Sequence, residues 1–249
     1  MVHTVPLLRL DAWQEKERVS PMANEDFSTV RDAKTEALCA LISQASRKEI
    51  ATVLVVGCGD GREAQVIADY FKAQGVAIDI GIPQQFVGRT QFVQMNAEQM
   101  AFRDGCFDLV FSFHALEHML NPAAALAEMA RVAKVGATFC VGTPNSRRWV
   151  GYIGSPTDWR TKLAWNWIDW KAMATGRFRN ELGAHAGFGR RELTAMCQTA
   201  FGTGDDITDA YYNRLYGPEA RSLTTLRALG LAERFLPSVY VVGTVARAA

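Results

Sequence analysis

The chain of 249 residues is 49% hydrophobic and 21% charged, a composition that is typical of globular proteins and excludes disorder. Its 27 basic and 26 acidic side chains leave a formal charge of +1, which argues against a nucleic-acid partner. No apolar run reaches the roughly 18 residues that span a bilayer, and the first residues turn polar too early for a secretory signal. The five cysteines include no Cys-x-x-Cys pair, which predicts reduced core thiols in a cytoplasmic protein.

Strands alternate with helices through the first 145 residues. A leading helix is predicted over 30–45, where it would cover the sheet or the site. The β-branched run at 52–56 predicts a buried strand, and apolar residues at helical spacing predict a helix that begins near Gly61. Three further strands are predicted, at 76–80, 91–95 and 107–113.

The second half of this pattern carries clear helix signals. Asn121 is a good helix cap, and Pro122 suits the first helical position, so a helix is predicted over 123–133 with Gly136 as its stop. The remaining predicted elements are a strand at 137–141, a helix at 190–200, a sixth strand that ends at Tyr211 and Tyr212, and a final strand at 238–245. Such alternation predicts a doubly wound α/β fold, with its ligand outside the carboxyl ends of the strands.

A glycine-rich loop follows the first strand. Gly57, Gly59 and Gly61 would let the backbone approach a ligand closely, although a tight strand–helix turn would use them equally well. A dinucleotide fingerprint needs its third glycine at position 62, which is arginine here, and no phosphate-binding Gly-Lys-Ser/Thr follows. Asp79 ends the next strand. A carboxylate in that register can accept both ribose hydroxyls of an adenosine, and the alternative is a turn or cap residue.

Five successive motifs between about 53 and 145 together resemble the class I S-adenosylmethionine-dependent methyltransferases, in their small-molecule branch. Val-Val-Gly-Cys-Gly-Asp-Gly at 55–61 resembles the cofactor loop, Ile-Asp-Ile at 78–80 the ribose-binding strand end, and Asn-Ala-Glu at 96–98 the adenine-contacting turn. Two further matches are the fourth-strand motif at 107–118 and the fifth-strand flanks at 134–136 and 144–145.

The resemblance implies a Rossmann-like, doubly wound, mostly parallel seven-stranded sheet with an antiparallel last strand and an aromatic-rich helical insertion. It also implies a set of residues that bind S-adenosylmethionine: Gly57, Cys58, Gly59, Gly61, Asp79, Ile80, Asn96, Ala97, Phe113 and His114. Two positions depart from the family pattern. Val55 and Asn96 stand where the family usually has acidic residues. At Asn96, the adenine amino group would therefore meet a neutral amide oxygen instead of a carboxylate.

The histidines are the candidates for proton transfer. His114, Glu117 and His118 share one helical face beyond the fourth strand, where three interpretations compete: a structural Glu-His pair, a general base, or a divalent-metal site. We expect a metal-free base, with His118 ahead of His185 and His114. His185 resembles the acceptor-facing histidine that precedes the sixth-strand helix in relatives, although it could equally be a loop residue bonded to backbone.

The segment 146–180 holds five of the six tryptophans and has seven basic against two acidic residues. Residues 159–174 place apolar side chains at helical spacing, which fits a helix that covers the core, a lid over the acceptor, or a helix at a membrane surface. The lid interpretation predicts that the acceptor contacts Trp149, Trp159, Trp167, Trp170 and Tyr211. The basic residues suggest an anionic, lipid-linked or sugar-linked acceptor.

The chain is therefore predicted to be a single methyltransferase domain. It would consist of an N-terminal helical cover at 1–50, a cofactor-binding core at 51–145, an acceptor lid at 146–185 and a completion of the sheet at 186–249. The predicted reaction is O-methylation of a small molecule, a saccharide, glycoconjugate or natural product. The alternatives are N- or C-methylation, or a regulatory protein that binds S-adenosylmethionine without catalysis.

Overall fold

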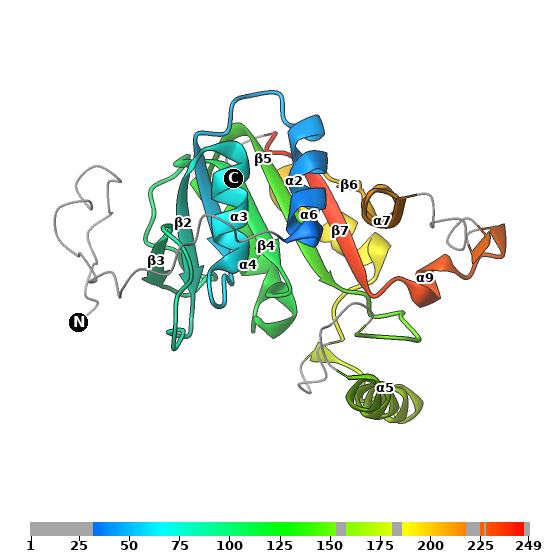
Figure 1. The fold of residues 1–249 in the computed structure, drawn as a ribbon. Helices are drawn as coiled ribbons and strands as arrows, with labels where there is room; N and C mark the ends of the chain where they lie inside the picture. The colour runs from blue at the N-terminus through cyan, green and yellow to red at the C-terminus, as the bar shows by residue number, and fades with distance from the viewer. Residues whose placement is uncertain (1–31, 153–157, 181–185, 218–224, 227, 247–249) are drawn as a thin grey trace.

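The computed structural model describes residues 32–152, 158–180, 186–217, 225–226 and 228–246. They form one seven-stranded sheet in the order β3-β2-β1-β4-β5-β7-β6 (Figure 1). The strands are β1 (Thr52–Val56), β2 (Gln74–Asp79), β3 (Gln91–Gln94), β4 (Phe107–Phe113), β5 (Ala133–Pro144), β6 (Asp205–Asp206) and β7 (Ser238–Thr244). Strands β1 to β5 pair in parallel, whereas β7 runs antiparallel to both β5 and β6. The predicted mostly parallel sheet with an antiparallel last strand is confirmed.

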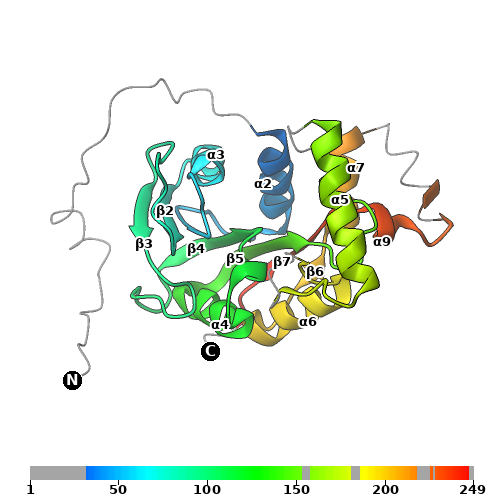
Figure 2. The same ribbon diagram turned by 90° about the horizontal axis from the view of Figure 1, so that it is seen from below.

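Helices cover both faces of the sheet (Figure 2). One face carries α2 (Ala33–Ala45), α3 (Arg62–Phe71) and α7 (Thr208–Tyr216), and the other carries α4 (Pro122–Val132) and α6 (Arg190–Phe201). Each layer closes its own apolar cluster, because alternate side chains of the buried strands point to opposite faces. Leu54 and Val56 join the α4–α6 cluster, whereas Val53 and Val55 join the α2–α3–α7 cluster.

Local sequence signals account for the helix ends. The Asn121 side chain accepts a hydrogen bond from the Ala124 amide at 3.1 Å, and Pro122 is the first residue of α4, as predicted. The same helix ends at Val132 instead of reaching Gly136. Its last predicted residue, Ala133, already pairs with Phe107 in the sheet, and the Lys134 ammonium bonds Asp108 at 2.8 Å. Strand β5 therefore begins earlier than predicted.

The predicted sixth strand is wrong in length and position. β6 consists of Asp205–Asp206, whereas Tyr211 and Tyr212 belong to helix α7. Both tyrosine rings are buried, and Tyr211 packs against Tyr240 with ring centroids 4.2 Å apart. Tyr211 and Tyr212 are adjacent, and such a short apolar run cannot be assigned to a helix or a strand from its periodicity alone, which explains the error.

The cysteine prediction is confirmed: all five cysteines are buried and free. Within the described ranges, no helix has the length and apolar character to cross a membrane. The remaining helical elements are the 3₁₀ turn η1 (Leu116–His118), α5 (Trp159–Ala174) and α9 (Ala232–Phe235). Figures 1 and 2 show α5 outside both helical layers, beside the edge of the sheet at which β5 ends.

Candidate active site

The glycine loop lies at the carboxyl edge of the sheet, between β1 and α3. The amides of Gly57 and Cys58 both donate to the Ile78 carbonyl, at 2.8 and 3.1 Å, so the loop is tied to the end of β2. Gly57 has φ of 73°, and a Cβ built there would lie 2.1 Å from the Ala115 Cβ. Only glycine allows the loop and the turn after β4 to approach this closely.

Asp79 is held in place by the backbone around it. Its carboxylate accepts hydrogen bonds from the Gly59 and Gly81 amides, each at 3.0 Å. These two bonds fix the orientation of the carboxylate, and each oxygen keeps a further lone pair for a ligand. In contrast with Gly57, a Cβ at Gly59 would meet no atom within 4 Å, although φ there is 52°. The space beside Gly59 and Asp79 is therefore open.

The other predicted cofactor residues near Asp79 are neutral, and several are apolar. Cys58 is buried, and burial together with the charge of Asp79 raises the pKa of its thiol to about 12. Ile80 follows Asp79 and leaves most of its side chain exposed, although it is apolar. The Asn96 side-chain oxygen accepts from the Glu98 amide at 2.9 Å, which shapes the turn after β3, and Ala97 is half-buried. The predicted cofactor residues from β1 to β3 thus lie on adjoining loops of one edge.

The histidine cluster is formed directly after β4. Glu117 is buried, and its Oε1 lies 3.6 Å from His114 Nδ1 and 3.8 Å from His118 Nε2. The structure therefore brings together the three residues that the spacing predicted. Phe113 is half-buried and contacts the His114 ring edge-to-face, with centroids 4.1 Å apart. His114 also adopts a left-handed backbone conformation with φ of 52°, which is uncommon outside glycine.

Burial shifts the pKa values of Glu117 and His114 away from those of exposed side chains. Desolvation raises the pKa of Glu117 to about 7, an effect that its own backbone amide and Arg148 partly oppose. Desolvation, followed by the positive charge of Arg148, lowers the pKa of His114 to about 4, although 40% of that side chain is exposed. His114 is therefore neutral at ordinary pH. Among the described residues, the Glu117 Oε2 atom has no hydrogen-bond partner.

Two residues of the cluster could not be found by sequence analysis. Ser238 Oγ lies 3.1 Å from His114 Nε2, because the β5–β7 pairing brings together residues that are 124 positions apart. Nothing in the sequence distinguishes Arg148 from the other basic residues of the segment 146–180. In the structure it is buried, and it donates to the carbonyls of Asn145 and Ala186 and to Asp169.

The metal alternative finds no support in this arrangement. Within the described parts of the chain, no group of three histidine, cysteine, aspartate or glutamate side chains is placed to hold a metal ion. His114, Glu117 and His118 are close in space, but one carboxylate oxygen faces both rings and the second oxygen is buried apart from them. The arrangement places one buried carboxyl group beside two imidazole rings.

The predicted acceptor residues are scattered. Tyr211 lies in the core, not on the surface of the site, so its predicted acceptor contact is wrong. Trp149 and Trp170 are about half exposed, and the Trp170 indole N–H donates to the Trp149 carbonyl. Trp159 and Trp167 are each 67% exposed. Of the three interpretations of this segment, the helix that covers the core with its apolar stripe is therefore excluded, and the lid stays a prediction. His185 lies outside the described residues.

A hollow of about 510 Å³ opens where the chain leaves β5. It is lined by Ser146, Phe178, Arg179, Asn180, Ala186, Gly187, Phe188 and Glu192, so the predicted tryptophans do not contribute to it. Arg179 brings a positive charge to this hollow and Glu192 a negative one, and the Glu192 carboxylate accepts from the Gly189 amide at 3.2 Å. Phe188 forms an isolated bridge with Asn145, which places the hollow at the carboxyl end of β5.

Comparison with known proteins relates this edge to a family. Residues 54–141 match the family described as a methyltransferase domain. Tocopherol O-methyltransferase of Arabidopsis thaliana is 31% identical over 111 residues, which cover 40% of this chain and 32% of that protein. Ajmaline N-methyltransferase of Rauvolfia serpentina is 32% identical over 118 residues, which cover 43% and 40%. The chain thus spans less than half of the length of these curated relatives.

One solved structure extends the comparison beyond the matched motifs. The plantazolicin methyltransferase BpumL in complex with SAH covers 85% of this chain and 82% of its own, with a TM-score of 0.57. Its sequence is only 12% identical, so the likeness is one of fold. The shared fold therefore extends beyond residues 54–141, which the family model matches.

Proposed function

We propose, from the match of residues 54–141 to the methyltransferase domain family, that the chain is a class I S-adenosylmethionine-dependent methyltransferase that methylates a small molecule at oxygen. The single observation that carries this proposal is the close approach of Gly57 to Ala115. It places the histidine cluster against the glycine loop. The methyl group of a cofactor bound in the loop and a histidine that accepts a proton would then lie at the same end of the sheet.

The residues present fit S-adenosylmethionine. The Asp79 carboxylate would bind the ribose hydroxyls, Gly59 would leave room for the cofactor beside it, and the exposed Ile80 would pack on the adenine. Asn96 would meet the adenine amino group. When bound, S-adenosylmethionine supplies an electrophilic methyl group on a sulfonium. The neutral Cys58 thiol and the half-buried Phe113 ring add no charge that would compete with that cation.

His118 is the base in this proposal. A hydroxyl acceptor loses its proton during methyl transfer, and a positioned base accelerates such a step by roughly 10²–10⁴-fold. His114 is a weak proton acceptor, because its pKa is lowered to about 4 and its Nε2 contacts Ser238. His118 is half exposed at the same edge, and Glu117 lies beside it to stabilise the imidazolium that forms. His185 stays a prediction as an acceptor contact or second base.

The acceptor is proposed to be a hydroxylated saccharide, glycoconjugate or natural product with an anionic group. Arg179 in the hollow at the end of β5 supports the anionic character, because a guanidinium binds carboxylate and phosphate through paired hydrogen bonds. The relatives named above include an O- and an N-methyltransferase, and an oxygen acceptor is favoured here because it requires the base that this cluster offers.

A transfer assay tests this function. The full chain is incubated with methyl-labelled S-adenosylmethionine and pooled hydroxylated metabolites and glycans, and labelled products are separated. For an acceptor found in this way, His118→Ala should lower kcat by roughly 10²–10⁴-fold, and the loss should shrink as rising pH ionises the hydroxyl unaided. Lys72→Gln, at an exposed position at the far end of α3, is the control. Equal turnover by His118→Ala and the native chain would remove His118 as the base, and cofactor binding without any transfer would favour the regulatory alternative.

A further inference from the structure

Helix α5 buries polar side chains and exposes apolar ones. Its buried residues are Asn166 and Asp169. Asn166 exchanges two hydrogen bonds with Gly151, accepting from its amide at 2.7 Å and donating to its carbonyl at 3.3 Å. Asp169 pairs with Arg148 at 3.1 Å, and both side chains are buried. These bonds fix the rotation of the helix about its own axis, with the polar face toward the domain.

Most of the large apolar side chains of α5 are exposed. Trp159 and Trp167 are 67% exposed, and Leu163 and Ile168 are exposed to a similar extent. The spacing of Trp159, Leu163 and Trp167 places them in one row along the helix. Exposed clusters of large apolar side chains are unusual on proteins that have no partner there, and they mark interaction sites. Among the described residues, the Arg160 guanidinium lies over the Trp159 ring, 5.4 Å from its centroid, and leaves most of this row exposed.

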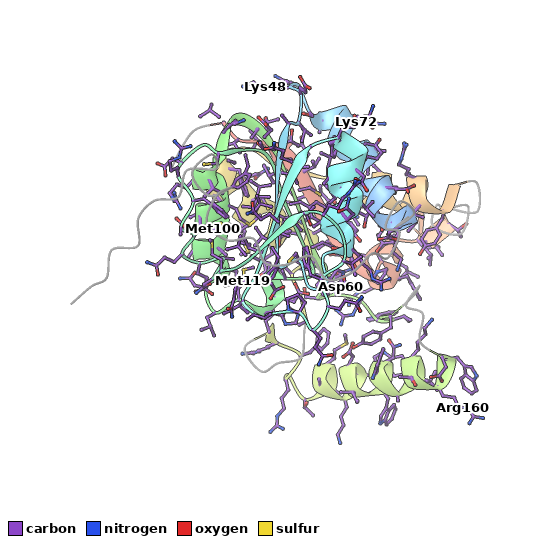
Figure 3. The ribbon with its side chains drawn as sticks, turned by 60° about the vertical axis from the view of Figure 1, so that its left-hand side comes forward. Lys48, Asp60, Lys72, Met100, Met119 and Arg160 are labelled. Carbon is purple, nitrogen blue, oxygen red and sulfur yellow. The ribbon has the colours of Figure 1, made fainter. Side chains whose placement is uncertain are left out.

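Basic side chains surround the apolar row. Arg160 and Lys171 project from the exposed part of the same helix, and Arg177 and Arg179 follow it. Figure 3 shows Arg160 at the end of α5, directed away from the rest of the molecule. The only acidic residues between 158 and 180 are Asp158, which caps the helix, and Asp169, which is paired with Arg148. The outward surface of α5 is therefore both apolar and positive.

We propose that the outward face of α5 docks on an anionic lipid bilayer. Tryptophan prefers the boundary between lipid headgroups and acyl chains, and nearby lysines and arginines attract anionic headgroups. A helix of 16 residues is about 24 Å long, enough to lie in the interface as a flat anchor. A second copy of the chain is a poorer occupant, because a symmetric contact would bring the same cations of both copies together.

Docking in this orientation would bring the end of the sheet that carries His114, Glu117 and His118 toward the bilayer. Arg148 joins α5 to the end of β5, and its charge acts on both His114 and Glu117. In Figure 3, Asp60 of the glycine loop and Met119 lie on the side of the domain that faces α5, whereas Lys48 and Lys72 lie on the opposite side. The acceptor would then be lipid-borne, a step that rests on the proposed function.

Vesicle binding tests the docking. The full chain is sedimented with vesicles of phosphatidylcholine alone or mixed with phosphatidylglycerol, at low and high salt. We expect binding to the anionic vesicles that weakens as salt rises. Trp159→Ala with Trp167→Ala should reduce the partition coefficient by at least roughly tenfold. Arg160→Gln with Lys171→Gln should reduce it by about 25-fold, since each cation near the surface is worth about fivefold.

The controls lie away from α5. Tyr70→Ala removes an exposed aromatic side chain on α3, and Lys72→Gln removes an exposed cation on the opposite side of the domain; neither should alter binding. S-adenosylmethionine affinity is measured for every variant and should stay unchanged, so a failure of docking is distinguished from a failure of the proposed function. The docking proposal is overturned by full binding of the tryptophan double variant, by no preference for anionic vesicles, or by self-association through α5 without vesicle binding.

Discussion

The glycine-loop edge and helix α5 are held to the same sheet by different kinds of contact. At the edge, backbone amides carry the structure: Gly57 and Cys58 donate to Ile78, and Gly59 donates to Asp79. At α5, side chains carry it, above all the buried pair of Arg148 and Asp169. Loops that are held by backbone bonds follow local sequence signals, whereas a helix that is held by its buried polar side chains can turn an apolar row to solvent. The difference explains why the first region was predictable and the second was not.

The largest expected effect comes from breaking the anchor of α5. Asp169→Ala leaves the Arg148 charge buried without its carboxylate partner. This should destabilise the packing of α5 on the domain by roughly 3–5 kcal/mol. Hydrogen exchange measures this locally: amides of α5 should lose protection while those of β1 and β4 keep theirs. Lys171→Ala, an exposed position on the same helix, should change little. Equal loss of protection throughout the domain would contradict the separation of the two regions.

In the glycine loop, alanine substitutions at Gly57 and Gly59 should differ in how much they destabilise the protein. Gly57→Ala should destabilise the protein by roughly 2–4 kcal/mol, because its methyl would overlap the Ala115 side chain at a positive φ. Gly59→Ala has the same kind of backbone strain but no neighbouring atom within 4 Å, so its cost should be only roughly 1–2 kcal/mol. Urea unfolding at pH 7 compares the two variants. Equal losses would show that the close approach to Ala115 does not constrain the loop.

The pH dependence of stability tests the histidine cluster. The pKa of Glu117 is raised from 4.5 to about 7 in the folded state, so its contribution is complete below pH 4.5 and is lost as pH rises through 7. His114, with its pKa lowered from 6.5 to about 4, acts in the opposite direction: its contribution is lost as pH falls from 6.5 to 4. The two effects partly cancel in the native chain.

Glu117→Gln isolates the carboxyl group, because the His114 contribution is common to the variant and the native chain. The free energy of unfolding of the variant, minus that of the native chain, should rise by about 1–3 kcal/mol between pH 4.5 and 7.5. Urea unfolding at several pH values gives this difference. A difference that stays flat over this range would mean that Glu117 ionises as an exposed carboxyl group does.

Sequence patterns predicted most of the fold and the position of the glycine loop and Asp79 at one end of the sheet, because those features depend on short-range signals. The run at Thr52–Val56, the Asn121 cap and the positive-φ glycines each determine a local conformation. The contact of His114 with Ser238 depends on the pairing of β5 with β7, which no local pattern encodes. The rotation of α5 could not be predicted for a related reason: burial of Asn166 and Asp169 requires partners that hydropathy does not reveal. The acceptor contact of Tyr211 was predicted wrongly because its ring is buried in the core.

Calorimetric titration with S-adenosylmethionine tests the central claim, that the edge formed by the glycine loop and Asp79 binds this cofactor. The native chain should bind one equivalent, and Asp79→Ala should weaken binding by roughly 1–3 kcal/mol, the cost of leaving hydroxyl groups without partners. Asp69→Ala, which removes an exposed carboxylate from the far end of α3, should bind like the native chain. If Asp79→Ala, correctly folded by circular dichroism, binds as tightly as the native chain, or if the native chain does not bind at all, the cofactor site is not at this edge.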